Sequence, residues 1–473
     1  MFADLKTGSA VQRLLSFSIP IFFTNFLQVF YALTDMAVVG RFVGDIGLAA
    51  IANGSIVAYL VGSIGTGLAV GGAVVIGHYK GAGNIAAQNE SLGTLLILAA
   101  LAAALVSPSG LIYAEDIFSF LEIPQTVLPE AASYLSVLCL GNPFFFCGTA
   151  LSFALRSLGD SRSPLYFMLI AGLINITLDF LLVGVLSFGV SGAAAATGAA
   201  QFAALLFAAF YLKRKKSLKL MEQPNPFQGA RFKAPLTGNA LPRRGFYFKA
   251  IGFGPRLDQA RRMLRIGLPS MVQLVMINLS YLAITVLING YGVTAAAAAG
   301  IGIKICTLAV MPCWAVGQAL TAMAANCLGA GDALEAGNLT RAALKLNLII
   351  TAAVVLMVQL AARPIMALFN PEAGEVIRAG VAYLRLCGSL GVIVYAFMYT
   401  CNCLATSAGA ATVAMLNSLL DSVVMRLLLI GLFIRAGYGL TGIYLGQALS
   451  AVLPAVLGGL YFRSRLWRGK KVI

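Results

Sequence analysis

The chain has 473 residues, of which 60% are hydrophobic and only 11% are charged. A soluble globular domain carries about 25% charged residues, so this composition excludes an ordinary soluble protein and predicts one that crosses a membrane several times. The net charge of +16 would suggest nucleic-acid binding in a soluble protein, but +11 of it falls within residues 213–262. We therefore expect the lipid bilayer, and not nucleic acid, as a partner.

Twelve apolar stretches are long enough to cross a bilayer as helices, which takes about 20 residues each. In the first half they are 14–40, 47–77, 92–112, 131–155, 164–186 and 190–212. In the second half they are 264–289, 296–325, 343–361, 380–404, 411–434 and 439–462. The first stretch is too long for a cleavable signal peptide and is expected to remain as a span. An all-α polytopic membrane protein with both termini on one side is predicted.

The first span carries a polar stripe. Thr24, Gln28, Tyr31 and Asp35 are spaced four, three and four residues apart, so on a helix they share one face. An ionised carboxylate within a membrane helix costs roughly 2.5–3.5 kcal/mol on insertion scales, which favours a functional role. The alternative is that Asp35 only lies near the outer helix end, among lipid headgroups.

The two halves of the chain repeat with an offset of 248–250 residues. Residues 12–20 resemble 261–269, residues 81–84 (GAGN) resemble 329–332 (GAGD), and residues 189–192 (GVSG) resemble 439–442 (GLTG). Six spans per repeat is an even number, so the predicted lobes are related by a pseudo-two-fold axis along the membrane normal, a transporter design. The expected domains are an N-lobe (1–212), a basic linker (213–262) and a C-lobe (263–473).

Basic residues fix the expected orientation. Of the 33 Lys and Arg residues, 26 fall at the termini or in loops on the side of the termini, counting Lys80, Arg156 and the linker among them. By the positive-inside rule, both termini and the linker are expected in the cytoplasm, with the protein in a bacterial cytoplasmic (inner) membrane. The linker contains five prolines and little helical periodicity, so it is predicted to be mostly irregular.

Three further residues are expected at the depth of Asp35. Asp35 and Asp179 each lie 15 residues beyond a proline that opens their span, which places both about 22 Å along a helix. Asn175 precedes Asp179 by four residues, and Thr197 lies six residues into the sixth span from Ser191. These oxygens form a candidate ion-coupling site for Na⁺, which prefers oxygen ligands, or for a proton held by one carboxyl group. Alternatively, Asn175 and Thr197 only satisfy Asp179 by hydrogen bonds.

The second half lacks counterparts of both aspartates. Its polar stripes include Tyr281, Tyr395 and Tyr399, which join Gln28 and Tyr31 as candidates for lining a substrate cavity. Four charged residues were expected to be buried there: Lys304, Arg385, Asp421 and Arg426. Asp421 and Arg426 are five residues apart, about 140° around an α-helix, so each is expected to find its partner on another helix. The eight cysteines and His78 are expected to be structural, without disulfides or a zinc site.

Several short motifs together resemble one transporter family. They are Tyr31-Ala32-Leu33-Thr34-Asp35 with Val39-Gly40, Gly81-Ala82-Gly83, Leu158-Gly159-Asp160, Asn175-x-x-x-Asp179 and Gly189-x-Ser191-Gly192-Ala193. The combination is similar to the multidrug and toxic compound extrusion (MATE) family, and to its DinF-like branch. The resemblance implies a two-lobe antiporter that exports cationic or amphipathic drugs in exchange for Na⁺ or H⁺.

The same resemblance places the ion site of DinF-like members at Asp35, Asn175, Asp179 and Thr197, which would hold Na⁺ only if the transporter is sodium-coupled. No cofactor other than this ion is expected. A monomer is expected. The alternative function is a lipid-linked oligosaccharide flippase on a related scaffold, whose pyrophosphate would need basic residues such as Lys304, Arg385 and Arg426. An enzyme is not expected, because the chain shows no nucleophile–base pair or metal motif.

Overall fold

A computed structural model describes residues 9–121, 123–214, 256–367, 374–470 and 472–473, with the side chains of 212–214 left out. Most of the predicted linker lies outside these residues. The described part of the chain is almost entirely helical, and twelve of its helical segments are long and apolar enough to span a membrane. The fold class predicted from the sequence is therefore confirmed.

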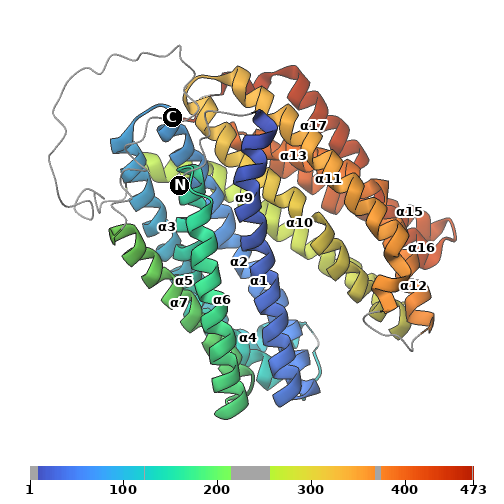
Figure 1. The fold of residues 1–473 in the computed structure, drawn as a ribbon. Helices are drawn as coiled ribbons and strands as arrows, with labels where there is room; N and C mark the ends of the chain where they lie inside the picture. The colour runs from blue at the N-terminus through green and yellow to red at the C-terminus, as the bar shows by residue number, and fades with distance from the viewer. Residues whose placement is uncertain (1–8, 122, 215–255, 368–373, 471) are drawn as a thin grey trace.

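Six spans form the first lobe, which contains one π-helical segment (η1) and one short helix (α4). Its elements are α1 (Ala10–Phe42), α2 (Asp45–Gly81), α3 (Ile85–Ile112), α4 (Ala114–Phe120), α5 (Leu128–Ser157), α6 (Arg162–Asp179), η1 (Phe180–Val185) and α7 (Gly189–Arg214). In Figure 1 these helices, blue to green, lie side by side on the left.

The second lobe repeats this order with more interruptions. Its elements are α9 (Leu257–Asn289), α10 (Val293–Gly329), α11 (Ala333–Ala367), α12 (Gly374–Cys387), α13 (Leu390–Ser407), α14 (Ala411–Leu419), η2 (Leu420–Met425), α15 (Arg426–Arg435), α16 (Gly439–Leu449), α17 (Val452–Ser464) and η3 (Leu466–Gly469). The start of α1 and the described C-terminal residues after η3 lie at the same end of the molecule, called here the termini end (Figure 1).

Several predicted boundaries were wrong. The predicted span 380–404 is broken at Gly388 and Ser389 into α12 and α13, whereas 439–462 falls within one span, Gly439–Ser464, with only a turn between α16 and α17. Glycine and serine are poor helix formers, and an apolar composition does not reveal such breaks. The helix α9 begins at Leu257, seven residues before the predicted start.

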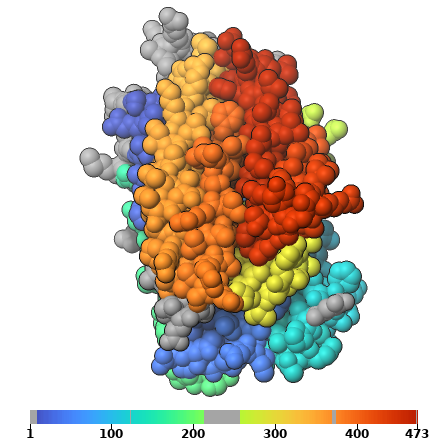
Figure 2. Space-filling model, turned by 90° about the vertical axis from the view of Figure 1, so that its right-hand side faces the viewer, coloured from blue at the N-terminus to red at the C-terminus, as the bar shows by residue number. Residues whose placement is uncertain are grey.

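Large apolar side chains cover the outside of the molecule. Leu105, Phe120 and Leu360 are each more than three-quarters exposed, and many other Leu, Phe and Ile side chains are exposed around the helices. A soluble monomer rarely exposes so much contiguous apolar surface, so this surface fits contact with lipid. Figure 2 looks onto the second lobe, which covers most of this face, while first-lobe residues emerge at the end away from the termini.

The two lobes meet near the termini end through a pair of related hydrogen bonds. His78 of α2 places its Nε2 2.8 Å from the carbonyl oxygen of Ser407 in the second lobe. Asn326 of α10 donates its Nδ2 to the carbonyl oxygen of Ser157 in the first lobe at 2.9 Å. Each lobe thus contributes one donor residue and one carbonyl, at positions related by the internal repeat.

Two glycines allow the helices to approach this closely. A Cβ added to Gly81 would lie 2.1 Å from the carbonyl oxygen of Asn326, and one added to Gly329 would lie 2.2 Å from that of His78. Both neighbours are backbone atoms, which cannot move aside as a flexible side chain would. Small residues at such positions let helix backbones pack in contact.

Candidate functional site

Asp35, Asn175, Asp179 and Thr197 meet inside the first lobe, as the depth argument predicts. The Thr197 hydroxyl donates a hydrogen bond to Oδ2 of Asp35 at 3.3 Å and accepts one from Nδ2 of Asn175 at 3.4 Å. The carboxyl groups of Asp35 and Asp179 are close enough for one proton to bridge them. The side chains of Asp35, Asn175 and Asp179 are buried, with exposed fractions of 6% or less.

Four oxygens of this cluster have no hydrogen-bond donor among the described residues. They are Oδ1 of Asp35, Oδ1 of Asn175 and both carboxylate oxygens of Asp179. A buried carboxylate without a partner is costly, so these atoms favour a bound cation or a bound proton. Oxygens from two carboxylates, one amide and one hydroxyl are suitable ligands for a hard cation such as Na⁺.

Three elements position these groups: α1 carries Asp35, α6 carries Asn175 and Asp179, and α7 carries Thr197. Asp179 is the last residue of α6, and the π-helical segment η1 follows it directly. Single π-helical turns within α-helices occur frequently at functional sites. Sequence periodicity assumes 3.6 residues per turn and did not predict this segment.

Three tyrosines interact electrostatically with Asp35, and one glutamine bonds to one of them. Tyr31, Tyr59 and Tyr134 are electrostatic neighbours of Asp35, and Gln201 is a hydrogen-bond partner of Tyr31. Sequence reasoning missed Gln201, although it follows Thr197 by four residues and so shares its helix face. Tyr59 and Tyr134 lie on α2 and α5, where no spacing linked them to the site.

A cavity of about 170 Å³ lies beside this cluster, toward the termini end of the first lobe. Its lining residues come from α1, α2, α5, α6 and α7, together with Gln318 of α10. Thr24 and Gln28 of the predicted stripe line the cavity, and so does Gln201, the partner of Tyr31. The side chains of Gln201 and Tyr31 therefore connect the cavity to Asp35.

The other predicted cavity residues lie elsewhere. Tyr31 is buried beside Asp35 and does not line the described cavity. Tyr281, Tyr395 and Tyr399 lie in the second lobe, where the rings of Tyr395 and Tyr399 stack with centroids 6.0 Å apart. The Tyr395 hydroxyl accepts a hydrogen bond from Nε1 of Trp314 at 3.2 Å.

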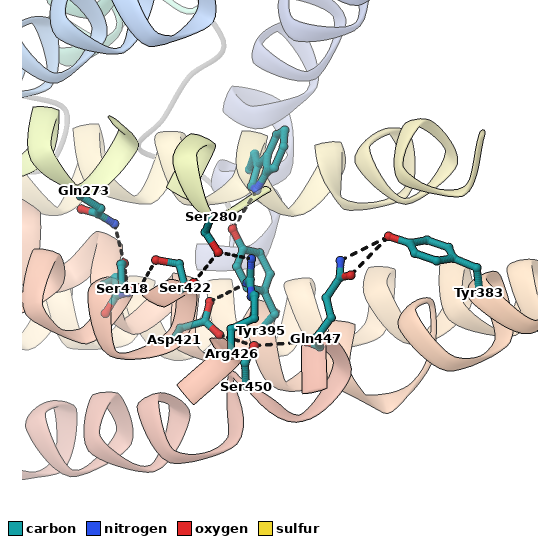
Figure 3. Close-up of polar contacts among 12 residues, drawn as sticks. Gln273, Ser280, Tyr383, Tyr395, Ser418, Asp421, Ser422, Arg426, Gln447 and Ser450 are labelled. Carbon is teal, nitrogen blue, oxygen red and sulfur yellow. Dashed lines mark hydrogen bonds and ion pairs between the residues drawn. The ribbon is translucent and has the colours of Figure 1, made fainter. Parts of the chain in front are cut away.

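The expectation for Asp421 and Arg426 was wrong in its main point. The two residues form a buried ion pair with each other, with 3.2 Å between Nη2 of Arg426 and Oδ2 of Asp421 (Figure 3). In an α-helix, residues five apart do not share a face. Here, however, Asp421 lies in the π-helical segment η2 and Arg426 directly follows it. The i→i+5 pattern of a π-helix brings residues five apart onto one face.

Other residues complete this pair in the second lobe. Ser450 donates to Oδ1 of Asp421 at 2.6 Å, and Nη1 of Arg426 donates to Ser280 of α9 at 3.4 Å (Figure 3). The guanidinium group of Arg426 also lies over the ring of Tyr281, 5.2 Å from its centroid. The single carboxylate in this region is thus neutralised, unlike those of the first lobe.

Lys304 and Arg385 are exposed, so their expected burial was wrong as well. Their neighbours Gly302 and Leu384 are buried. Hydropathy identifies a span but not which face a residue occupies. Of the three basic residues of the flippase alternative, Arg426 is paired with Asp421 and the other two are exposed.

A family model described as MatE matches residues 20–181 and again 269–430. The chain belongs to the MatE family. The two matched stretches begin 249 residues apart, which agrees with the repeat in the sequence.

Individual relatives of this family member support the same conclusion. The chain is 28% identical to "Probable multidrug resistance protein YoeA" of Bacillus subtilis over 78% of this chain and 75% of that protein. It is 25% identical to "Probable multidrug resistance protein YpnP" of the same organism over 99% of this chain and 98% of that protein. A solved MOP superfamily transporter from Pyrococcus furiosus, described as having a binding pocket of reversed polarity, superposes with a TM-score of 0.86. That structure is 21% identical and covers 98% of this chain and 97% of its own, which shows a shared fold.

Proposed function

We propose that this MatE family member exports amphipathic drugs and other toxic small molecules across the membrane in exchange for Na⁺ or H⁺. The observation that carries the proposal is the group of four buried oxygens without donors on Asp35, Asn175 and Asp179. A cation or proton that binds there neutralises a cluster that is otherwise costly to bury. The names of the multidrug resistance proteins to which the chain is similar support export of drugs.

Coupling would arise from the link between this cluster and the neighbouring cavity. Thr197 joins α7 to Asp35 on α1, and Gln201, one turn further along α7, lines the cavity. Ion binding between α1, α6 and α7 would draw these helices together and change the shape of the cavity. A substrate bound there would then be released, which is the exchange that alternating access requires.

The direction of exchange follows from the proposed orientation. The termini end faces the cytoplasm of a bacterial cell, where basic residues are enriched, and the protein acts as a monomer without an organic cofactor. A membrane potential that is negative inside favours inward movement of a cation, worth about 2.3 kcal/mol per charge per 100 mV. No carboxylate lines the described cavity.

The test is dye efflux from liposomes that contain the purified protein, with Na⁺ and H⁺ gradients imposed separately. We expect one of the two gradients to drive efflux of a fluorescent amphipathic dye, and empty liposomes to show none. Efflux that neither gradient changes would contradict an antiporter.

A further inference from the structure

The first-lobe cavity contains one charged residue, and it is basic. Arg156 lines the cavity, together with amide and hydroxyl side chains and three phenylalanines, while no Asp or Glu is among the lining residues. Sequence analysis counted Arg156 as a loop residue, but α5 continues to Ser157 and carries Arg156 inside the lobe. Arg156 is only 5% exposed.

The guanidinium group of Arg156 has no anionic partner in the described part of the chain. The ion pairs found there are Arg13–Glu335, Arg256–Glu90 and Arg426–Asp421. Arg156 donates from Nη1 to Oε1 of Gln318, a neutral group, and its buried Nε has no hydrogen-bond partner. A buried charge without a counter-charge is costly, so the site favours a ligand that brings a negative charge.

The shape of the group selects among anions. A guanidinium presents a planar fork of N–H donors that matches a carboxylate or phosphate in a bidentate arrangement. Its Cζ lies over the ring of Phe153, 5.2 Å from the centroid, a cation–π contact. Gln318 accepts only from Nη1, which leaves other N–H donors of the guanidinium for a carboxylate.

The remaining lining fits an aromatic ring. Phe145, Phe153 and Phe167 supply apolar faces, and Gln28 and Gln201 supply amide groups on the side toward Asp35. The cavity volume of about 170 Å³ is similar to that of a dry cavity of ~150 Å³ that binds benzene in another protein. One aromatic ring with one acidic group would fill it.

We propose that Arg156 makes this cavity a binding site for aromatic carboxylates or the aromatic carboxylate end of a larger compound. The proposal rests on the proposed function only in treating the cavity as part of the substrate route. Arg156 acts as the specificity-determining residue: it pairs with the anion, and it repels a cationic group at the same place. The exported compounds are then amphipathic organic acids.

Three probes of one shape test this directly: benzoate, benzamide and benzamidine, which differ mainly in charge. Their dissociation constants are measured by calorimetry on the purified protein in lipid nanodiscs, without an ion gradient. We expect benzoate to bind about tenfold or more tightly than benzamide, the effect of one hydrogen-bonded charge pair, and benzamidine to bind most weakly. Equal binding of the three, or tighter binding of benzamidine, would overturn the proposal, and this comparison needs no variant.

Variants assign the effect to Arg156. R156Q should remove the preference for benzoate over benzamide, and R156K should retain part of it because the charge stays. R341Q is the matched control, because Arg341 is an exposed arginine outside the cavity. If R156Q keeps the full preference, or R341Q loses it, Arg156 is not the determinant.

The two proposals fail separately. A protein that expels a dye under an ion gradient but binds the three probes equally refutes the inference about Arg156 alone. A protein that binds benzoate through Arg156 but shows no gradient-driven efflux refutes the antiporter and leaves the anion site in place.

Discussion

The hydroxyl of Thr197 lies 3.3 Å from Oδ2 of Asp35, and this contact joins the sixth span of the first lobe to the first. The same hydroxyl accepts a hydrogen bond from the side-chain amide of Asn175. One side chain therefore touches residues of both other helices that form the cluster. If the cluster couples ion binding to transport, the contact must matter for ion affinity.

T197V tests that role, because valine keeps the shape of threonine and removes the hydroxyl. If Na⁺ drives the wild-type protein, we expect the Na⁺ concentration that gives half-maximal dye efflux to rise about tenfold, because the ion loses a hydroxyl ligand. If protons drive it, we expect the half-maximal proton concentration to fall about tenfold, because the carboxylate of Asp35 loses a hydrogen bond that stabilises its ionised form. The measurement is efflux from liposomes over a range of pH and Na⁺ concentration.

T177V is the control for this variant. Thr177 is exposed on α6, and its hydroxyl bonds only to the carbonyl oxygen of Leu173 in the same helix. Its ion dependence should match that of the wild type. An unchanged ion dependence in T197V would show that the contact with Asp35 plays no part in coupling.

The Asp421–Arg426 pair should be structural. D421N leaves the guanidinium of Arg426 buried without a counter-charge, which costs about 3–5 kcal/mol. Replacing both residues by leucine removes the stranded charge and should recover much of the lost stability. Thermal unfolding of the detergent-purified variants compares the two. A double variant less stable than D421N would mean that the pair itself, and not the stranded charge, determines stability.

The reciprocal bonds of His78 and Asn326 should hold the lobes together at the termini end. H78A and N326A each remove one interlobe hydrogen bond, worth about 0.5–1.5 kcal/mol, which corresponds to a factor of about 2–10 in the ratio of closed to open molecules. Spin labels on the two lobes at this end should report a larger fraction of long distances. S464A is the control, because Ser464 is exposed and its hydroxyl bonds only to backbone atoms within the second lobe. Unchanged distances in both variants would exclude this role.

G329A tests the same contact between the lobes by adding a methyl group where the two helix backbones touch. The added methyl group would meet the backbone of His78 at 2.2 Å, so the lobes cannot close as they do here. We expect this single methyl group to shift the spin-label distances more than H78A does. Distances identical to those of the wild type would show that the lobes do not need this approach.

The first-lobe site could be predicted from the sequence because it depends on distances along regular helices. Asp35 and Asp179 each lie 15 residues beyond a proline, Pro20 within α1 and Pro164 in the first turn of α6, and a fixed rise per residue turns that count into depth. The Asn175–Asp179 spacing then gives the shared face. No knowledge of how the helices pack was needed for these three residues.

Other features depend on departures from regular helices. The Asp421–Arg426 pair forms because a π-helical segment changes the angle between residues five apart. Arg156 and Lys80 were assigned to loops by their charge, but both lie buried at helix ends, where each side chain finds a hydrogen-bond acceptor. Composition marks such residues as solvent-facing, and only the packing of α5 and α2 shows otherwise.

The central claim is that Asp35 and Asp179 bind the coupling ion, and the most direct test is dye efflux by D35N and D179N in liposomes. Both variants should incorporate normally into liposomes. Under the gradient that drives the wild-type protein they should show no efflux, because a neutral amide cannot bind the coupling ion as the carboxylate does. C401A, a buried cysteine in the second lobe, should retain wild-type efflux. Full gradient-driven efflux by D35N would contradict the account.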